Sequence, residues 1–149
     1  MKVFHSYGSR ERLFEMMERV TGVELDKQVS SGDKEFIIDE FINFASEKLG
    51  LGENMPNITI SHDSNEAVDM KSFGKYTPGD GKILVVAANR NTADILRTLG
   101  HEMVHFKQYE EGRLKPNSGE DGTEFENEAN SVAGVLMREF GRNNPKIFE

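Results

Sequence analysis

The stretch His101-Glu102-Met103-Val104-His105 is a HExxH motif, and it lies within a helical pattern that spans residues 92–112. Residues four apart lie on the same face of an α-helix, so both imidazoles can point at one metal ion. Glu102 projects beside this pair, where a carboxylate can accept a proton from a water held by the metal. The motif therefore predicts two zinc ligands, His101 and His105, and a general base, Glu102.

The segment around the motif also has the features of a core helix. Asn91 provides an N-cap at its start, and Gly112 is placed to end it. Its apolar residues recur at helical spacing: Ile95, Leu96, Leu99, Met103 and Phe106. An ordinary amphipathic helix with two surface histidines would show the same stripe. The two interpretations are compatible, because a metal-binding helix must be anchored in a core to hold its ligands still.

The N-terminal half predicts helices. Helical spacing of apolar residues indicates a first helix over residues 9–20, and a polar loop over residues 28–33 follows it. A second helix is expected from Glu35 to Leu49, with Gly50 at its end. The apolar residues assigned to its core face are Phe36, Ile37, Phe41, Ile42, Phe44, Ala45 and Leu49.

Strands are expected in the middle of the chain. β-branched or alternating residues occur at residues 58–60, 67–76 and 82–88, and the run from Thr77 to Gly81 is rich in turn residues. These segments predict a small, mostly antiparallel sheet. A last helix, residues 123–141, completes an α+β fold.

A catalytic zinc site usually has three protein ligands, so one remains to be found. The positions that supply glycine and a third histidine in metzincins are Gln108 and Glu111 here. In the last helix, Glu126 lies about 60° from the centre of the apolar face, whereas Glu128 lies about 100° away on the other flank. Glu126 is therefore the expected third ligand, and Glu128 is the alternative.

Two further residues bear on this ligand. Asn130 follows Glu126 by four residues, so its amide can support a histidine ligand from the second shell. Thr123 precedes Glu126 by three residues, and in a capping box the glutamate would instead bond to the N-cap amide. The remaining histidines, His5 and His62, are far from the motif in sequence and are interpreted as surface residues.

Composition limits the classes of function. The chain has 149 residues, which predicts a single domain over residues 1–149. A net charge of −8 without a Lys/Arg cluster argues against nucleic-acid binding. Without cysteine, zinc must use histidine and carboxylate ligands. The longest apolar run, residues 83–88, is too short to span a membrane, and we expect a soluble, cytoplasmic protein.

Two motifs together resemble a known family. His101-Glu102-x-x-His105 followed by Glu126-x-x-Ala129-Asn130 resembles the gluzincin zinc metallopeptidases. Their second signature reads E-x-x-A-[DN] in several branches, including the ImmA/IrrE-like peptidases. Residues 93–100 and 106–109, which flank the first motif, look like short HExxH proteins encoded by tailed bacteriophages. The resemblance extends over residues 82–137.

The resemblance implies a minimal zincin-like fold, with an active-site helix, a glutamate-bearing helix and a small sheet whose edge pairs with an extended peptide. It implies that His101, His105 and Glu126 bind zinc, that Glu102 is the general base, and that Asn130 is a second-shell residue.

The chain also departs from the family. Asn130 stands where many gluzincins have aspartate, and the chain is too short for the C-terminal domain that supplies transition-state donors in the thermolysin-like branch. The oxyanion stabiliser is therefore unassigned. Tyr76 and Tyr109 are candidates, and ordinary packing is the alternative role for each.

We therefore expect a zinc-dependent metalloendopeptidase that cleaves a peptide or protein substrate bound in extended form. One alternative is a catalytically weak or inactive zincin-fold module that binds or regulates peptides without cutting them. The other is a small acidic interaction domain without a functional metal. Manganese or cobalt can occupy the same ligands as zinc. The oligomeric state and the cognate substrate are not indicated by the sequence.

Overall fold

The computed structural model describes residues 2–7, 25–63, 73–113 and 123–148. Its strands are β1 (Lys2–Ser6), β2 (Asn57–Ser61), β3 (Gly74–Thr77) and β4 (Lys82–Val86). Its α-helices are α2 (Leu25–Leu49), α4 (Thr92–Glu110) and α5 (Glu124–Asn143), and a 3-10 helix, η1 (Pro145–Phe148), follows. The predicted α+β fold class is confirmed.

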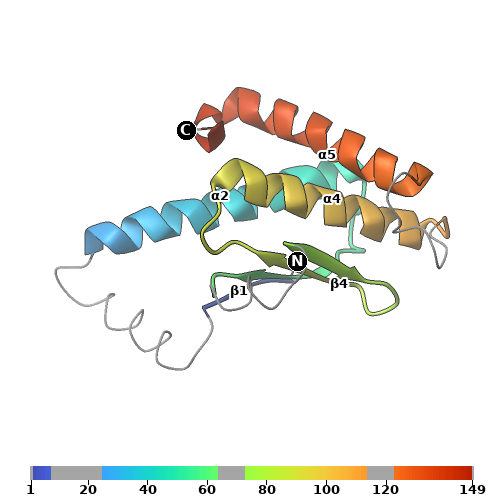
Figure 1. Ribbon diagram of the computed structural model, residues 1–149, viewed down its shortest axis with the longest axis horizontal. Coiled ribbons are helices and arrows are strands. Elements are labelled where there is room, and N and C mark those ends of the chain that lie inside the picture. Colours follow the sequence, from blue (N-terminus) through green and yellow to red (C-terminus); the bar gives the residue numbers. More distant parts are fainter. Residues whose placement is uncertain (1, 8–24, 64–72, 114–122, 149) are drawn as a thin grey trace.

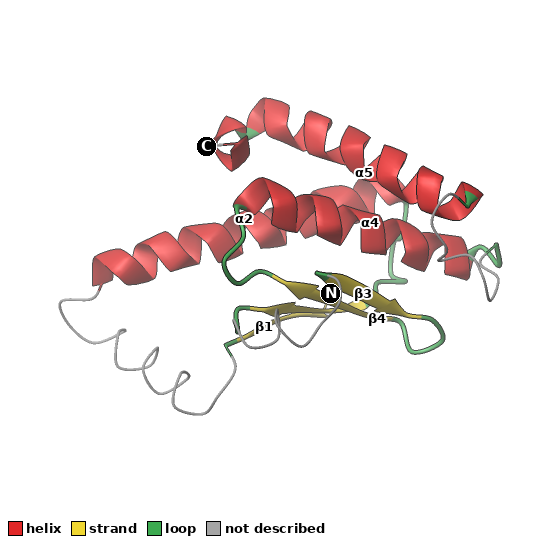
Figure 2. Cartoon of the chain, in the orientation of Figure 1, coloured by secondary structure: helices red, strands yellow, loops and turns green. Residues whose placement is uncertain are grey.

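The described helices lie on one side of the sheet. Helices α2 and α4 lie nearest to the strands, and α5 runs along the far side of α4 (Figures 1 and 2). Gly100 lies between the neighbouring helices, because a Cβ there would be at van der Waals distance from both, 3.4 Å from Phe41 Cζ on α2 and 3.5 Å from Ala133 Cβ on α5. The HExxH helix is therefore held between the sheet and the C-terminal helix.

The sheet has the order β1-β2-β4-β3 and is mixed. β1 pairs with β2 and β2 pairs with β4 in parallel, and only β3 and β4 are antiparallel. The expectation of a mostly antiparallel sheet was wrong, and strand β1 was not predicted. The turn residues between β3 and β4 predicted the one hairpin correctly. Helix α2 connects β1 to β2, and such a crossover returns the chain in the same direction.

Helix α2 differs from its prediction at the N-terminal end. It begins at Leu25, so residues 28–33 are helical and not a loop. The polar residues there have only modest helical penalties, of about 1 kcal/mol even for glycine, and extending an existing helix adds one hydrogen bond per residue. The helix ends as predicted, with Gly50 at φ 69°. Phe36, assigned to the core face, is 60% exposed.

The other predicted elements agree with the structure, with small shifts at their ends. Helix α4 has Asn91 as its N-cap, and α5 has Thr123 as its N-cap and continues two residues beyond Gly141. The predicted helix over residues 9–20 and most of the predicted strand over residues 67–76 lie outside the described residues. Each described helix is too short or too polar to cross a lipid bilayer.

The core lies where α2, α4, α5 and the sheet meet. Phe41 and Phe140 contact each other edge to face, with ring centroids 5.3 Å apart. Large side chains with almost no exposed surface come from α2, α4 and the sheet: Ile38, Ile42, Ile58, Ile60, Ile83, Ile95, Leu96, Leu99 and Met103. This core anchors the face of α4 that lies opposite the motif histidines.

Candidate metal centre

Three of the predicted site residues meet where α4 packs against α5. His101 Nε2 lies 2.8 Å from Glu126 Oε1, and His105 Nε2 lies 3.0 Å from Glu126 Oε2. The two Nε2 atoms are 3.1 Å apart. His101 and His105 stand one turn apart on α4, and Glu126 projects from the first turn of α5. The three groups therefore form a cluster of two imidazoles and one carboxylate.

This cluster fits a zinc ion by its donor chemistry and its spacing. Zinc binds histidine nitrogen and carboxylate oxygen at about 2.0–2.2 Å, which places tetrahedral ligands about 3.3 Å apart. The distances within the cluster, 2.8 to 3.1 Å, are slightly shorter, as hydrogen-bonded side chains would be. A small outward movement of each side chain would admit the ion.

Asn130 supports His101 in the manner predicted. Its Oδ1 lies 2.8 Å from His101 Nδ1, so the ring donates Nδ1–H and presents Nε2 to the cluster. Burial lowers the pKa of His101, and the nearby Glu126 carboxylate opposes that shift. A lowered pKa favours the neutral imidazole, which is the form that binds a metal.

Gln108 supports His105, and this role was not predicted. Its side chain is fully buried, and its Nε2 donates to the Phe125 carbonyl at 3.0 Å and to Glu128 Oε1 at 3.2 Å. Its Oε1 therefore faces His105 Nδ1, 2.9 Å away. From the sequence, Gln108 was noted only as the position of a metzincin glycine. It follows His105 by three residues and so lies on the same face of α4 as the two histidines, and that spacing was the available signal.

Glu128, the alternative third ligand, has another role. Its carboxylate binds Arg113 at 2.7 Å and accepts from Gln108, so it belongs to the support of His105. The hydroxyl of Thr123 accepts from the Glu126 amide at 3.2 Å, as expected of an N-cap. Both carboxylate oxygens of Glu126 nevertheless contact the histidines. Packing of α5 on α4 thus favours Glu126 over Glu128.

Glu102 lies buried beside the cluster, with 9% of its surface exposed. The backbone of β3 approaches it closely, since a Cβ on Gly74 would lie 3.2 Å from Glu102 Cγ. The pKa of Glu102 is raised to about 7, chiefly by burial; the nearby His105 opposes this shift and the nearby Glu126 adds to it. A carboxyl group with this pKa can both accept and return a proton near neutral pH.

Tyr76 and Tyr109 occupy one aromatic cluster with Phe106. The Tyr76 ring lies edge-on to Phe106 at 6.1 Å and to Tyr109 at 6.3 Å. The Tyr76 hydroxyl is buried and has no hydrogen-bond partner within the described residues, and burial raises its pKa to about 12. The described contacts of both rings are aromatic packing contacts.

His5 and His62, which were predicted to be surface residues, are half-buried and lie beside each other. His5 Nδ1 lies 3.0 Å from His62 Nε2, and His5 is 14% exposed. They form a separate cluster with residues of α2.

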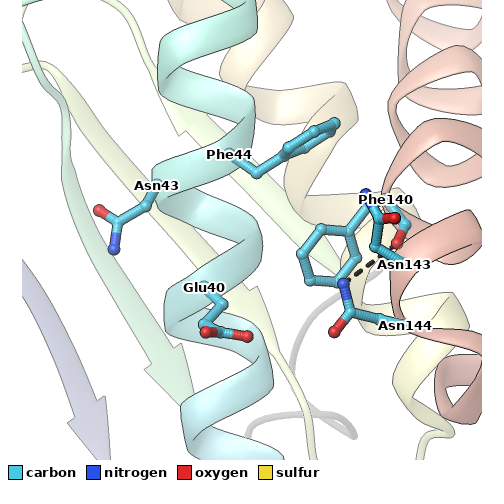
Figure 3. A pocket seen from close by; sticks show the side chains of 6 residues that line it. All are labelled: Glu40, Asn43, Phe44, Phe140, Asn143 and Asn144. Carbon is cyan, nitrogen blue, oxygen red and sulfur yellow. Dashed lines mark hydrogen bonds between the residues drawn. The ribbon is translucent and has the colours of Figure 1, made fainter.

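A shallow pocket of about 290 Å³ lies elsewhere, between α2 and the C-terminal end of α5. Figure 3 shows Phe44 and Phe140 within it, and Asn144 donates to the Phe140 carbonyl at 3.2 Å. Its lining has no histidine, and Glu40 is its one acidic residue. The pocket is at the opposite end of α5 from Glu126, and it offers one carboxylate and no imidazole to a metal ion.

Comparisons of the chain with protein-family models, with curated proteins and with solved structures gave no significant match.

Proposed function

We propose that this protein is a zinc-dependent metallopeptidase, with His101, His105 and Glu126 as zinc ligands and Glu102 as general base. One observation carries the proposal: two imidazole Nε2 atoms and a carboxylate meet within 3.1 Å, beside a buried carboxyl group. Each histidine has its other nitrogen held by an amide oxygen, which is the second-shell arrangement typical of metal ligands.

Each residue of the site would have a separate role in the reaction. When bound, zinc would supply a Lewis acid that acidifies water and polarises the scissile carbonyl. Glu102 would take the proton of the attacking water and return it to the leaving nitrogen. Asn130 and Gln108 would keep both imidazoles in the Nδ1–H tautomer, so that Nε2 is always presented to the metal.

The substrate would be a peptide or protein segment in extended form, added beside β3. β3 is a terminal strand in the described sheet, and its Gly74 backbone lies against Glu102. A peptide that pairs with a strand edge gains affinity from main-chain hydrogen bonds. A scissile bond on that side would lie near the general base. The net charge of −8 does not favour a nucleic-acid partner.

Glu102→Gln is the variant that tests this function. The zinc-loaded parent is incubated with a library of unstructured peptides, and new termini are identified by mass spectrometry. We expect cleavage by the parent and a loss of about a hundredfold or more in Glu102→Gln, because general-base catalysis is removed. Elemental analysis should find the same zinc content in both proteins, since Glu102 is not a ligand.

Glu110→Gln is the matched control, because it removes the same charge from an exposed position on the same helix. It should cleave like the parent. Full activity in Glu102→Gln would overturn the assignment of the base. A parent that binds zinc through His101 and cleaves no peptide would favour the non-catalytic peptide-binding alternative.

A further inference from the structure

A second cluster of histidine and carboxylate side chains lies where β1 and β2 end, at the edge of the described sheet opposite β3. His5 is on β1, and His62 directly follows β2. The strands are parallel, with Ser6 opposite Ser61, and the His62 amide donates to the Ser6 carbonyl at 2.7 Å. Because parallel strands end at the same edge, both imidazoles reach one corner of the sheet.

Helix α2 lies over this corner and adds carboxylates (Figure 1). Glu35 and Asp39 are four residues apart on α2, so they lie on one face of the helix. His5, Glu35 and His62 each offer one ligand atom, and these three atoms lie within 4.8 Å of one another. Apart from His101, His105 and Glu126, this is the one group of its kind in the described part of the chain.

The orientation of His5 is that of a metal ligand. Asp39 Oδ1 lies 2.9 Å from His5 Nε2, so it can accept Nε2–H and leave the Nδ1 lone pair directed at His62 Nε2, 3.0 Å away. A carboxylate on the distal nitrogen is a common second-shell partner of metal-bound histidine. The arrangement repeats what Asn130 and Gln108 do in the first cluster.

The ring of His62 is held from two sides. It stacks on Tyr7, with centroids 4.8 Å apart and planes at 12°, and on His5, with centroids 5.2 Å apart and planes at 25°. Stacked rings restrict rotation, so Nε2 of His62 stays directed at the same point. All three potential ligands are half-buried, which limits competition from water without closing the site.

The donor atoms limit which metal ions this cluster can bind. Two imidazoles and a carboxylate suit zinc, nickel, copper or iron, whereas calcium and magnesium prefer sites built from oxygen alone. Glu35 and Asp39 together carry two negative charges, which match a divalent cation.

We infer that His5, Glu35 and His62 bind a divalent transition-metal ion, with Asp39 as a positioning residue. The ion would link three elements that are distant in sequence: β1, α2 and the end of β2. β1 is a terminal strand of the described sheet and pairs there with β2 alone. The role that follows is structural, because the ion would fasten this strand to the helix above it.

Zinc stoichiometry in four full-length proteins tests the inference. Each protein is reconstituted with zinc, freed of excess metal by gel filtration and subjected to elemental analysis. We expect two zinc ions per chain in the parent, one in His101→Ala, one in His62→Ala and none in the double variant. If the second cluster binds zinc and the first does not, the parent and His101→Ala would each bind one zinc ion, and His62→Ala would bind none. The measurement therefore tests the two predicted sites independently.

Substitutions on α2 provide a second, independent measurement. In the His101→Ala protein, Glu35→Gln should weaken zinc binding at least tenfold, and Asp39→Asn about 10- to 100-fold. Glu40→Gln, an exposed substitution on the same helix with the same charge change, should leave the affinity unchanged. Zinc should also slow amide hydrogen exchange in β1 of His101→Ala and have no such effect in the double variant.

The inference is overturned if His101→Ala binds no zinc, or if His62→Ala and Glu35→Gln leave its zinc content and affinity unchanged. In either case, the short distances among His62, His5 and Asp39 would reflect only hydrogen bonds between these side chains.

Discussion

Gln108 Oε1 lies 2.9 Å from His105 Nδ1, and the orientation of this amide is determined by its other contacts. The Gln108 nitrogen donates to Phe125 and to Glu128, so the oxygen is left to face the imidazole. Arg113 in turn holds Glu128. A chain of contacts therefore runs from an arginine at the end of α4 to a histidine of the candidate metal centre.

Gln108→Leu should weaken zinc binding at the first cluster by about 10- to 100-fold, because His105 would lose the acceptor that fixes its tautomer. Leucine has a similar size, so the helix should still pack. The dissociation constant is measured by competition with a chromophoric chelator, in a His62→Ala background that isolates this site. Asn130→Ala should have a comparable effect through His101. Asn127→Ala, an exposed change on α5, is the control, and a similar loss there would contradict the proposed specificity.

Metal removal should lower the thermal stability of the parent. A ligand that binds only the folded state stabilises it by about 2.7 kcal/mol when its free concentration is 100 times the dissociation constant. Calorimetry with zinc and with a chelator should therefore give a higher Tm for the zinc-loaded protein. The His101→Ala, His62→Ala double variant should give the same Tm in both conditions. An equal chelator effect in that variant would show that the stabilisation comes from elsewhere.

Gly74→Ala should destabilise the protein and reduce peptidase activity. The added Cβ would lie 2.5 Å from Thr98 Cγ2, so β3 would have to move away from α4 and Glu102. Overpacking of this kind costs about 1–3 kcal/mol. Combining it with Thr98→Ser should restore much of the stability, because serine lacks the methyl group and keeps the hydroxyl that accepts from Arg90. Unfolding in denaturant measures both variants, and no recovery in the double variant would contradict this account.

Glu128→Gln should reduce stability at neutral pH and have little effect in acid. Hydrogen bonds from Arg113 hold the pKa of Glu128 below its ordinary value of 4.5, burial opposes that shift, and Gln108 adds to it. Because the pKa of Glu128 is lower in the folded protein than in the unfolded chain, the ion pair with Arg113 stabilises the fold at pH values above the pKa of the unfolded state. This stabilisation is lost as pH falls through the folded value.

The quantity to measure is the difference in free energy of unfolding between the parent and Glu128→Gln, with chelator present, from pH 7 to pH 3. It should be constant above pH 5 and shrink below about 4.5. Arg113→Gln should give the same trend, since it removes the other partner. A difference that does not change with pH would mean that the ion pair contributes nothing.

Features that depend on short spacings could be predicted from the sequence alone. His101 and His105 are four residues apart, so any helix through them must bring their side chains to one face. The ends of α4 and the start of α5 followed from Asn91, Gly112 and Thr123, because caps act on the nearest backbone groups. Helical periodicity also favoured Glu126 as the third member of the cluster.

Features that depend on the packing of elements distant in sequence could not be predicted and came from the fold. The direction of β1 beside β2 and the meeting of His5 with His62 across 57 residues have no local signal. Glu126 and Glu128 are two residues apart on one helix, and the position of α5 against α4 brought one to the histidines and the other to Arg113. Local periodicity specifies the face of each element, and burial of the common core then selects which faces meet.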